Sequence, residues 1–353
     1  MSMYYPFRTP VRSLVAALAI MLIAGASHAA DQFNISGYYK NFFVVFKPVT
    51  LPGFTPPSQS ETMGMVTNRL RLNMEYEISG DVKFHSAYNF VPRIQDPGLF
   101  EQSLLVSSLE QSPYRVTDPD QTLYPGDDDS GGSFAILQNI DRAHLSVALP
   151  FADVYVGRQP VAFGMARVIN PTDIIAPFTF QELDTEERSG VDAIRIRIPQ
   201  GFMSELDIGY VAGEDFEWNR SAVFVREKTY YMETDVSLLL VGFHKHLMAG
   251  VNLARSVGEA GAWLEAAYTL ARPFTDGAFR NIDNYFRGSV GMDYNFGSKT
   301  YGFIEYHYND PGGDEPQDYI WNVYPDPALA YDDGAVYLLG QQYLIPGINY
   351  HIT

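Results

Sequence analysis

Two groups of side chains in this sequence have the chemistry of metal ligands. Acidic residues gather between 118 and 129, and carboxylate oxygens suit calcium or magnesium, although their spacing differs from the twelve-residue calcium loop and also fits a solvated loop tip. His244 and His246 lie two apart, which places them on one face of a strand as zinc ligands can be, but no third histidine is near and the chain has no cysteine. The sequence therefore predicts no cofactor and leaves the acidic segment as the one candidate for a divalent cation. Its carboxylates are Asp118, Asp120, Asp127, Asp128 and Asp129.

The remaining chemistry-bearing residues do not form a recognisable enzyme motif. No Gly-x-Ser-x-Gly sequence is present, and no serine, histidine and acid set is indicated by spacing. Catalytic triads are assembled in space, so an enzyme of the lipase or protease type stays an alternative. The formal charge of −18 argues against nucleic acid as a partner, because phosphate binding needs a basic surface.

The N-terminus has the pattern of an export signal. Two arginines precede an apolar run at 13–25, and small residues follow it, which predicts cleavage after Ala29 or Ala30. The apolar run is too short to cross a bilayer of roughly 30 Å as a helix. We therefore predict a signal peptide at 1–29 and a single domain at 30–353.

The rest of the chain is dominated by strict alternation of apolar and polar residues. This two-residue period indicates strands with one wet face. The strands read at about ten residues, the length that crosses a membrane at a tilt, whereas soluble strands average about five or six. The clearest stretches are 69–78, 142–149, 194–198, 286–296 and 303–308.

The connections between these strands alternate between short and long, as in outer-membrane barrels with short periplasmic turns and long outer loops. Short turns are expected at 79–81, 150–152, 199–201 and 297–299, and long connections at 48–64, 92–134, 159–189, 272–284 and 310–339. Counting 222–229 as a strand, with a turn at 230–233, keeps this order and gives 14 strands. The final residue, Thr353, is not the aromatic expected there, so the count becomes 16 or more if the sequence stops early. The predicted fold is all-β, a transmembrane antiparallel up-and-down β-barrel.

If the apolar partners face lipid, their polar neighbours line the lumen, where water accommodates charges of both signs. The arginines among them would form an electropositive stripe that favours anions. The alternative is that the charges pair across strands and fill a narrow barrel. The same parity points Trp263 inward. The predicted lining residues are Lys40, Arg69, Arg71, Glu75, Arg142, His144, Arg195, Arg197, Glu265, Arg287, Asp293 and Glu305.

The connection after residue 157 carries three short motifs, Gly157-Arg158-Gln159-Pro160, Asn170-Pro171-Thr172-Asp173 and Glu186-Glu187-Arg188-Ser189-Gly190-Val191-Asp192-Ala193. They resemble the alginate-export-like and related porin-like barrels of Gram-negative bacteria. This resemblance implies an outer-membrane channel with a loop near the pore, but it carries over no substrate. Oppositely charged residues along the loop suggest that it folds inward as a constriction, the alternative being a surface loop. The predicted constriction residues are Arg158, Arg167, Asn170, Asp173, Glu186, Glu187 and Arg188.

These observations predict a porin-like channel of the cell outer membrane for passive or weakly selective passage of small polar or ionic solutes. The expected partners are outer-membrane lipids and lipopolysaccharide, the barrel-assembly machinery and the solutes themselves. Besides the enzyme, a structural or adhesive barrel whose long acidic loops bind a partner is an alternative.

Overall fold

The computed structural model describes residues 32–46, 62–97, 114–125, 132–177, 187–273, 284–315 and 338–351. The predicted signal peptide lies outside them. Within these ranges, regular structure consists of fifteen strands and two three-residue 3-10 helices. No helix of the described residues is long and apolar enough to span a bilayer.

The strands form one sheet whose order follows the sequence. Fourteen of them lie side by side, each antiparallel to its neighbours, and β4 pairs only with β5. The antiparallel up-and-down arrangement is therefore confirmed, and the fourteen predicted strands correspond to this continuous path. The three-residue β4 is an addition inside the long connection predicted at 92–134. The elements are β1 (Phe33–Phe46), β2 (Met63–Ser79), β3 (Val82–Gln95), β4 (Thr122–Tyr124), β5 (Phe134–Leu149), β6 (Ala152–Pro160), β7 (Gly190–Pro199), β8 (Glu205–Val211), η1 (Glu214–Phe216), η2 (Trp218–Arg220), β9 (Ala222–Tyr231), β10 (Thr234–Phe243), β11 (His246–Val257), β12 (Ala260–Leu270), β13 (Tyr285–Phe296), β14 (Thr300–Asn309) and β15 (Gln342–Tyr350).

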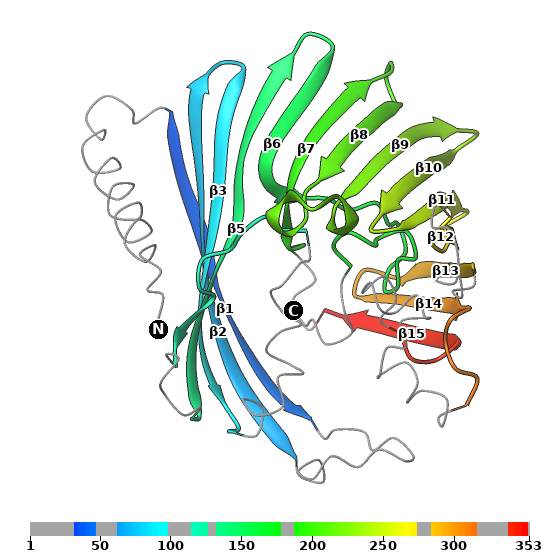
Figure 1. The fold of residues 1–353 in the computed structure, drawn as a ribbon. Coiled ribbons are helices and arrows are strands. Elements are labelled where there is room, and N and C mark those ends of the chain that lie inside the picture. The colour runs from blue at the N-terminus through cyan, green and yellow to red at the C-terminus, as the bar shows by residue number, and fades with distance from the viewer. Residues whose placement is uncertain are drawn as a thin grey trace.

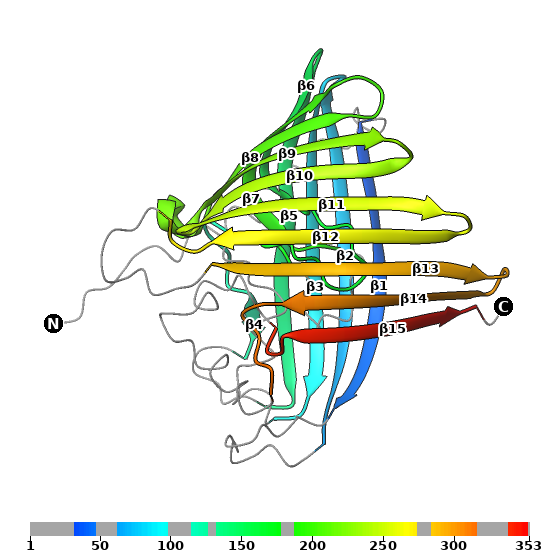
Figure 2. The ribbon, with the colours of Figure 1, turned by 90° about the vertical axis from the view of Figure 1, so that its right-hand side faces the viewer.

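The sheet curls into a deep arch with β1 and β15 at its two edges (Figure 1). In Figure 2, β11 to β15 cross β1 to β3 on the opposite wall at a steep angle, as tilted strands of a strongly curved sheet do. The alternation along the sequence predicts a closed barrel. Among the described strands, however, β1 pairs with β2 and β15 with β14, and the two edge strands are not paired with each other.

The convex face of the arch is apolar and exposed, and the concave face is polar and covered. Leu70 and Leu72 on β2 are 41% and 43% exposed, whereas Arg71 between them is only 2% exposed. β14 repeats this reversal of the pattern of a soluble core, with Ile304 and Tyr306 exposed and Glu305 and His307 fully buried. The two-residue period predicted from the sequence thus separates two faces of opposite character.

An apolar cluster occupies one side of the arch's interior. The segment that follows β6, residues 161–177 (the inner loop), packs here against the concave side of β7 to β12. Phe163 of the loop meets Phe224 of β9 edge to face, with ring centroids 4.9 Å apart. Ile174 and Ile175 are buried in the same cluster. The inner loop and this cluster therefore fill part of the interior against β7 to β12, whereas the buried side chains of β2 and β3 include Arg71, Asn89 and Arg93.

The turns follow the predicted asymmetry at one end of the sheet. Two to five residues join β2 to β3, β5 to β6, β7 to β8, β9 to β10, β11 to β12 and β13 to β14. We call this end the short-turn end. At the other end, β10 and β11 are joined by the two-residue turn His244–Lys245, in which His244 has a φ of 49°. The prediction that His244 and His246 share a face of one strand is therefore wrong, because His244 belongs to the turn.

Candidate functional site

The inner loop is held inside the arch by two buried carboxylates from the far side of the sheet. Glu265 on β12 is 1% exposed. Its Oε2 accepts the backbone N–H groups of Met165 and Ala166 at 2.8 and 3.1 Å. Its Oε1 accepts the N–H and the hydroxyl of Thr172 at 2.8 and 2.7 Å. Four hydrogen bonds to one carboxylate compensate for its removal from water.

Glu305 on β14 has the same role, two strands further along the sheet. It is fully buried, and its Oε2 accepts the backbone N–H groups of Arg167 and Val168 at 2.9 and 3.3 Å. Its Oε1 accepts the N–H of Ile169 at 2.8 Å. The indole N–H of Trp263 completes the set at 3.1 Å from Oε2. Both glutamates lie on the concave face, where the inner loop covers them and they act as its anchors.

A third carboxylate closes the loop on itself. Asp173 Oδ1 accepts the backbone N–H groups of Phe163 and Gly164 at 2.5 and 2.9 Å, and its Oδ2 lies 2.5 Å from the Arg188 guanidinium. Arg188 also donates to the carbonyl oxygen of Ala176 at 2.8 Å. Asn170 is buried against Gly164, where a Cβ would overlap the Asn170 side chain. The loop therefore has a defined shape set by its own polar groups.

The motif residues on β6 and β7 meet directly across the sheet. Arg158 and Asp192 are cross-strand partners, and the guanidinium binds the carboxylate through two hydrogen bonds of 2.8 and 3.0 Å. Arg158 also pairs with Asp118 and donates to the carbonyl oxygens of Thr117 and Ile140. All three sequence motifs thus belong to one network that bounds the inner loop at both ends.

Asp118, a member of the predicted cation cluster, binds arginine. It accepts from Arg115 at 3.3 Å as well as from Arg158. Asp120 is exposed, and Asp127, Asp128 and Asp129 lie outside the described residues. Within the described ranges, no group of three or more acids and histidines is placed to hold a metal ion.

Arginines line the wall of the concave face formed by β2 and β5 to β9. Arg71 and Arg142 share Asp141, at 2.7 and 2.6 Å. Asp141 faces inward beside Arg142 because the pairing of β3 with β5 shifts by one residue at this point. Glu187 approaches both arginines at 3.4 Å. Arg115 also lies 3.9 Å from Asp141 and pairs in turn with Asp118.

A second group on the same wall has one more cationic side chain than it has anionic side chains. Asp207 is fully buried and binds Arg195 at 2.5 Å and Arg226 at 3.0 Å. Glu205 binds Arg197 at 2.8 Å and Arg226 at 3.4 Å. Three guanidinium groups therefore share two carboxylates. The Arg197 side chain is about one-third exposed, so its charge is open to solvent.

Other predicted lining residues also face inward. Lys40 and Arg69 are cross-strand partners on β1 and β2. Glu75 is bound by Lys83 at 3.2 Å, and His144 stacks on His85 with centroids 4.9 Å apart. Arg287 is buried and donates to the Pro171 carbonyl oxygen at 2.7 Å. Asp293 binds Arg167. Glu186 lies outside the described residues.

Arg167 is the loop's charged tip. Its guanidinium binds Asp293 on β13 at 2.7 Å, stacks over the Trp263 ring at 5.4 Å from the centroid, and is half exposed. Partial burial alone lowers the pKa of Arg167, but the hydrogen bond to Asp293 and the nearby Tyr301 outweigh it, so the pKa is raised. The charge is therefore permanent.

Among the described residues, the concave face has cavities toward the short-turn end, of which two are considered in turn. One, of about 460 Å³, lies on the arginine wall and is lined by Arg71, Arg142, Arg195 and Arg197 together with His85, among others. The other, of about 510 Å³, lies beneath the inner loop against β9 to β12.

Sequence reasoning missed several members of these networks. Alternation does not identify Asp141 as an inward residue, because the bulge breaks the two-residue period and the pattern then assigns Asp141 to the convex face. Arg226 lies in the strand predicted at 222–229, and its parity with the buried Phe224 would have identified it. The contribution of Thr172 to the Glu265 site depends on loop geometry, for which the sequence carries no signal.

No family model matches the chain, and no curated protein matches it. Solved structures that resemble it include a BenF-like porin from Pseudomonas fluorescens, at 13% identity and a TM-score of 0.45, with 80% of this chain and 68% of that chain covered. OmpF from Salmonella typhi has 11% identity and a TM-score of 0.43, with 78% of each chain covered. A mutant porin from Rh. blastica has 13% identity and a TM-score of 0.43, with 79% of this chain and 84% of that chain covered. All three TM-scores lie below 0.5.

Proposed function

We propose that this chain forms a water-filled channel in the cell outer membrane for passive or weakly selective passage of small polar or ionic solutes. The observation that carries the proposal is the opposite character of the two faces of one sheet. Its convex face exposes apolar side chains strand after strand, and its concave face gathers ion pairs. An exposed apolar face of this extent suits hydrocarbon, and a charged interior suits water.

We further propose that the inner loop constricts this channel. Its contacts to Glu265 and Glu305 reach across the interior from β6 to β12 and β14. The apolar cluster fills the side of the interior behind the loop, so the open path runs along the arginine wall. The surplus cation of the Arg195, Arg197 and Arg226 group supports a preference for anions on that path.

The finer assignment, to the alginate-export-like barrels, rests on the motifs alone. What supports it is that the motif residues pair with one another beside the inner loop, Arg158 with Asp192 and Arg188 with Asp173. Outer-membrane lipids, lipopolysaccharide and the barrel-assembly machinery are proposed partners of such a protein. The transported solute is not included in this assignment.

Planar-bilayer recording of the purified protein tests the channel, and we expect stepwise conductance with mild anion preference. Replacing 165–171 by three glycines should raise the single-channel conductance, because it removes the segment that crosses the interior. The matched control replaces 214–220, a loop of equal length at the rim, and should leave conductance unchanged. A protein that is soluble without detergent and silent in bilayers would remove the proposal.

One described set of side chains has the composition of a serine hydrolase site. Ser146 Oγ lies 3.1 Å from His85 Nε2, and His85 Nδ1 lies 3.4 Å from Glu75. Ser146 sits within β5, however, and pairs on both sides with β3 and β6, so its backbone is engaged in the sheet instead of forming an oxyanion hole. Glu75 is also bound by Lys83. The set fits a hydrated polar ladder better than an active site.

A further inference from the structure

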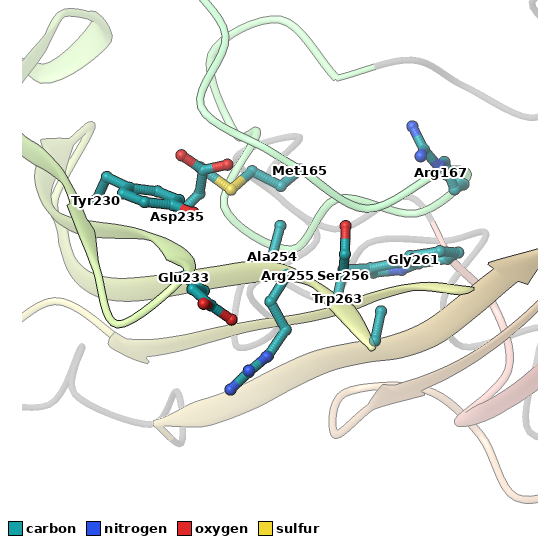
Figure 3. Close-up of a pocket in the computed structure, with 11 residues that line it drawn as sticks. Met165, Arg167, Tyr230, Glu233, Asp235, Ala254, Arg255, Ser256, Gly261 and Trp263 are labelled. Carbon is teal, nitrogen blue, oxygen red and sulfur yellow. The ribbon is translucent and has the colours of Figure 1, made fainter. Parts of the chain in front are cut away.

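The cavity beneath the inner loop has a lining unlike that of the arginine wall. It lies at the short-turn ends of β9 to β12, and Met165 and Arg167 cover it from the loop (Figure 3). Its volume of about 510 Å³ falls within the range of roughly 300–1,000 Å³ that is typical of small-molecule sites. Two carboxylates, from Glu233 and Asp235, belong to its lining. The cavity is therefore large enough and polar enough to hold a solute.

The lining residues of this cavity form a row across four strands. Tyr230 on β9 is the direct cross-strand partner of Asp235 on β10, which is the partner of Ala254 on β11, which in turn is the partner of Trp263 on β12. Partners in register share a face, so a ring and a carboxylate lie side by side and a small residue separates them from a second ring. Asp235 and Trp263 are two strand spacings apart, about 10 Å at the backbone.

The charge around this row is acidic and not neutralised from within. The inward carboxylates of Asp141, Asp207 and Asp293 are bound by arginine, whereas Glu233 and Asp235 make no ion pair with any described residue. Both are exposed. They are thus available to a cation from solution.

The two arginines of the lining do not cancel these carboxylates. The charge of Arg167 is compensated by Asp293. Arg255 leaves β11 on the opposite side from Ala254 and Ser256, which point toward the loop (Figure 3). What remains facing the cavity is a carboxylate beside an aromatic ring, the combination that attracts organic cations.

We propose that this cavity is a binding site for small organic cations with a short apolar body, such as aryl-alkyl ammonium ions. The ammonium group binds Asp235 beside the Tyr230 ring, with Glu233 adding to the field. The apolar body lies over Ala254 and contacts Met165 and the edge of Trp263. The proposal rests on the proposed channel function and deepens it, because it gives one solute class a binding site in the interior, beside the open path along the arginine wall.

Isothermal titration of the detergent-purified full chain tests the site with three probes of one shape, which are benzylammonium, benzyl alcohol and benzoate. We expect benzylammonium to bind at least tenfold more tightly than the other two. Asp235→Asn should weaken its binding by about tenfold or more, since the ammonium group then has a neutral acceptor in place of a charged one. Tyr230→Leu should weaken it by about two- to fivefold. Asp81→Asn is the matched control, because it removes an exposed carboxylate from a short turn outside the cavity, and it should change nothing.

Equal weakening by the Asp235 and Asp81 variants would overturn the site, since it would reduce the effect to general electrostatics of that end of the sheet. Binding of benzoate as tight as that of benzylammonium would overturn it too. Titration measures binding and does not require conductance, so it tests the binding site independently of the channel. If the channel also conducts, benzylammonium should block the current of the wild type and of Asp81→Asn but not that of Asp235→Asn.

Discussion

Removing the Glu305 carboxylate tests whether the inner loop is docked by this acceptor. In Glu305→Ala, three backbone N–H groups of the loop and the Trp263 indole lose their partner. Hydrogen bonds to a charged group contribute about 1.5–3 kcal/mol each, so the four sum to roughly 6–12 kcal/mol before costs. Burying the carboxylate costs several kcal/mol, which leaves a net loss of about 3–5 kcal/mol on truncation. That exceeds the roughly 1.4 kcal/mol that changes an equilibrium tenfold, so the loop should leave its docked position.

Two measurements test whether the inner loop leaves its docked position. Hydrogen exchange of the peptide covering 163–173 should accelerate by two orders of magnitude or more, while peptides from β2 and β3 keep their protection. Single-channel conductance should rise in the same variant. Glu259→Ala, which removes an exposed carboxylate bound to Tyr294, is the control and should do neither. Unchanged exchange in the loop of Glu305→Ala would show that the hydrogen bonds described above do not hold it.

Three further substitutions probe the same architecture. Arg188→Ala removes the partner of the buried Asp173 and should destabilise the docked loop by about 3–5 kcal/mol, seen as faster exchange of the loop amides. Gly190→Ala places a Cβ against a β5 carbonyl oxygen and should reduce the yield of folded protein, whereas Gly80→Ala, with open space around it, should be tolerated, as a comparison of folded fractions would show. Arg197→Gln removes the exposed member of the arginine group, so the reversal potential in a salt gradient should move toward cation preference, and an unchanged potential would exclude this wall as the selective element.

The sheet was predictable because its signal is repeated in every strand. Alternation fixed which side chains face inward, and the rule of short and long connections identified 222–229 as a strand, which the structure gives as Ala222–Tyr231. The inward direction of Trp263 followed from the same parity. The alternation of apolar and polar residues is a local pattern that does not depend on tertiary contacts, so it predicts the two faces of each strand from the sequence alone.

The contacts inside the arch were less predictable, because they depend on register and on loop shape. One extra residue in β5 brings Asp141 to the inner face, and the spacing of residues in the sequence does not predict this bulge. Glu265, Arg287 and Glu305 were expected to border open water, but the inner loop covers all three. Their partners are backbone groups, which every residue possesses, so side-chain chemistry along the sequence could not reveal the pairing.

The long reach of the inner loop has a consequence for the order of events during biogenesis. Its acceptors on β12 and β14 follow it in the chain by 93 to 138 residues. Until those strands take their places, the amide groups of 165–172 have only water to bind. The inner loop therefore docks late in assembly, and the passage through a partly assembled sheet would be wider and leakier than that through the finished one.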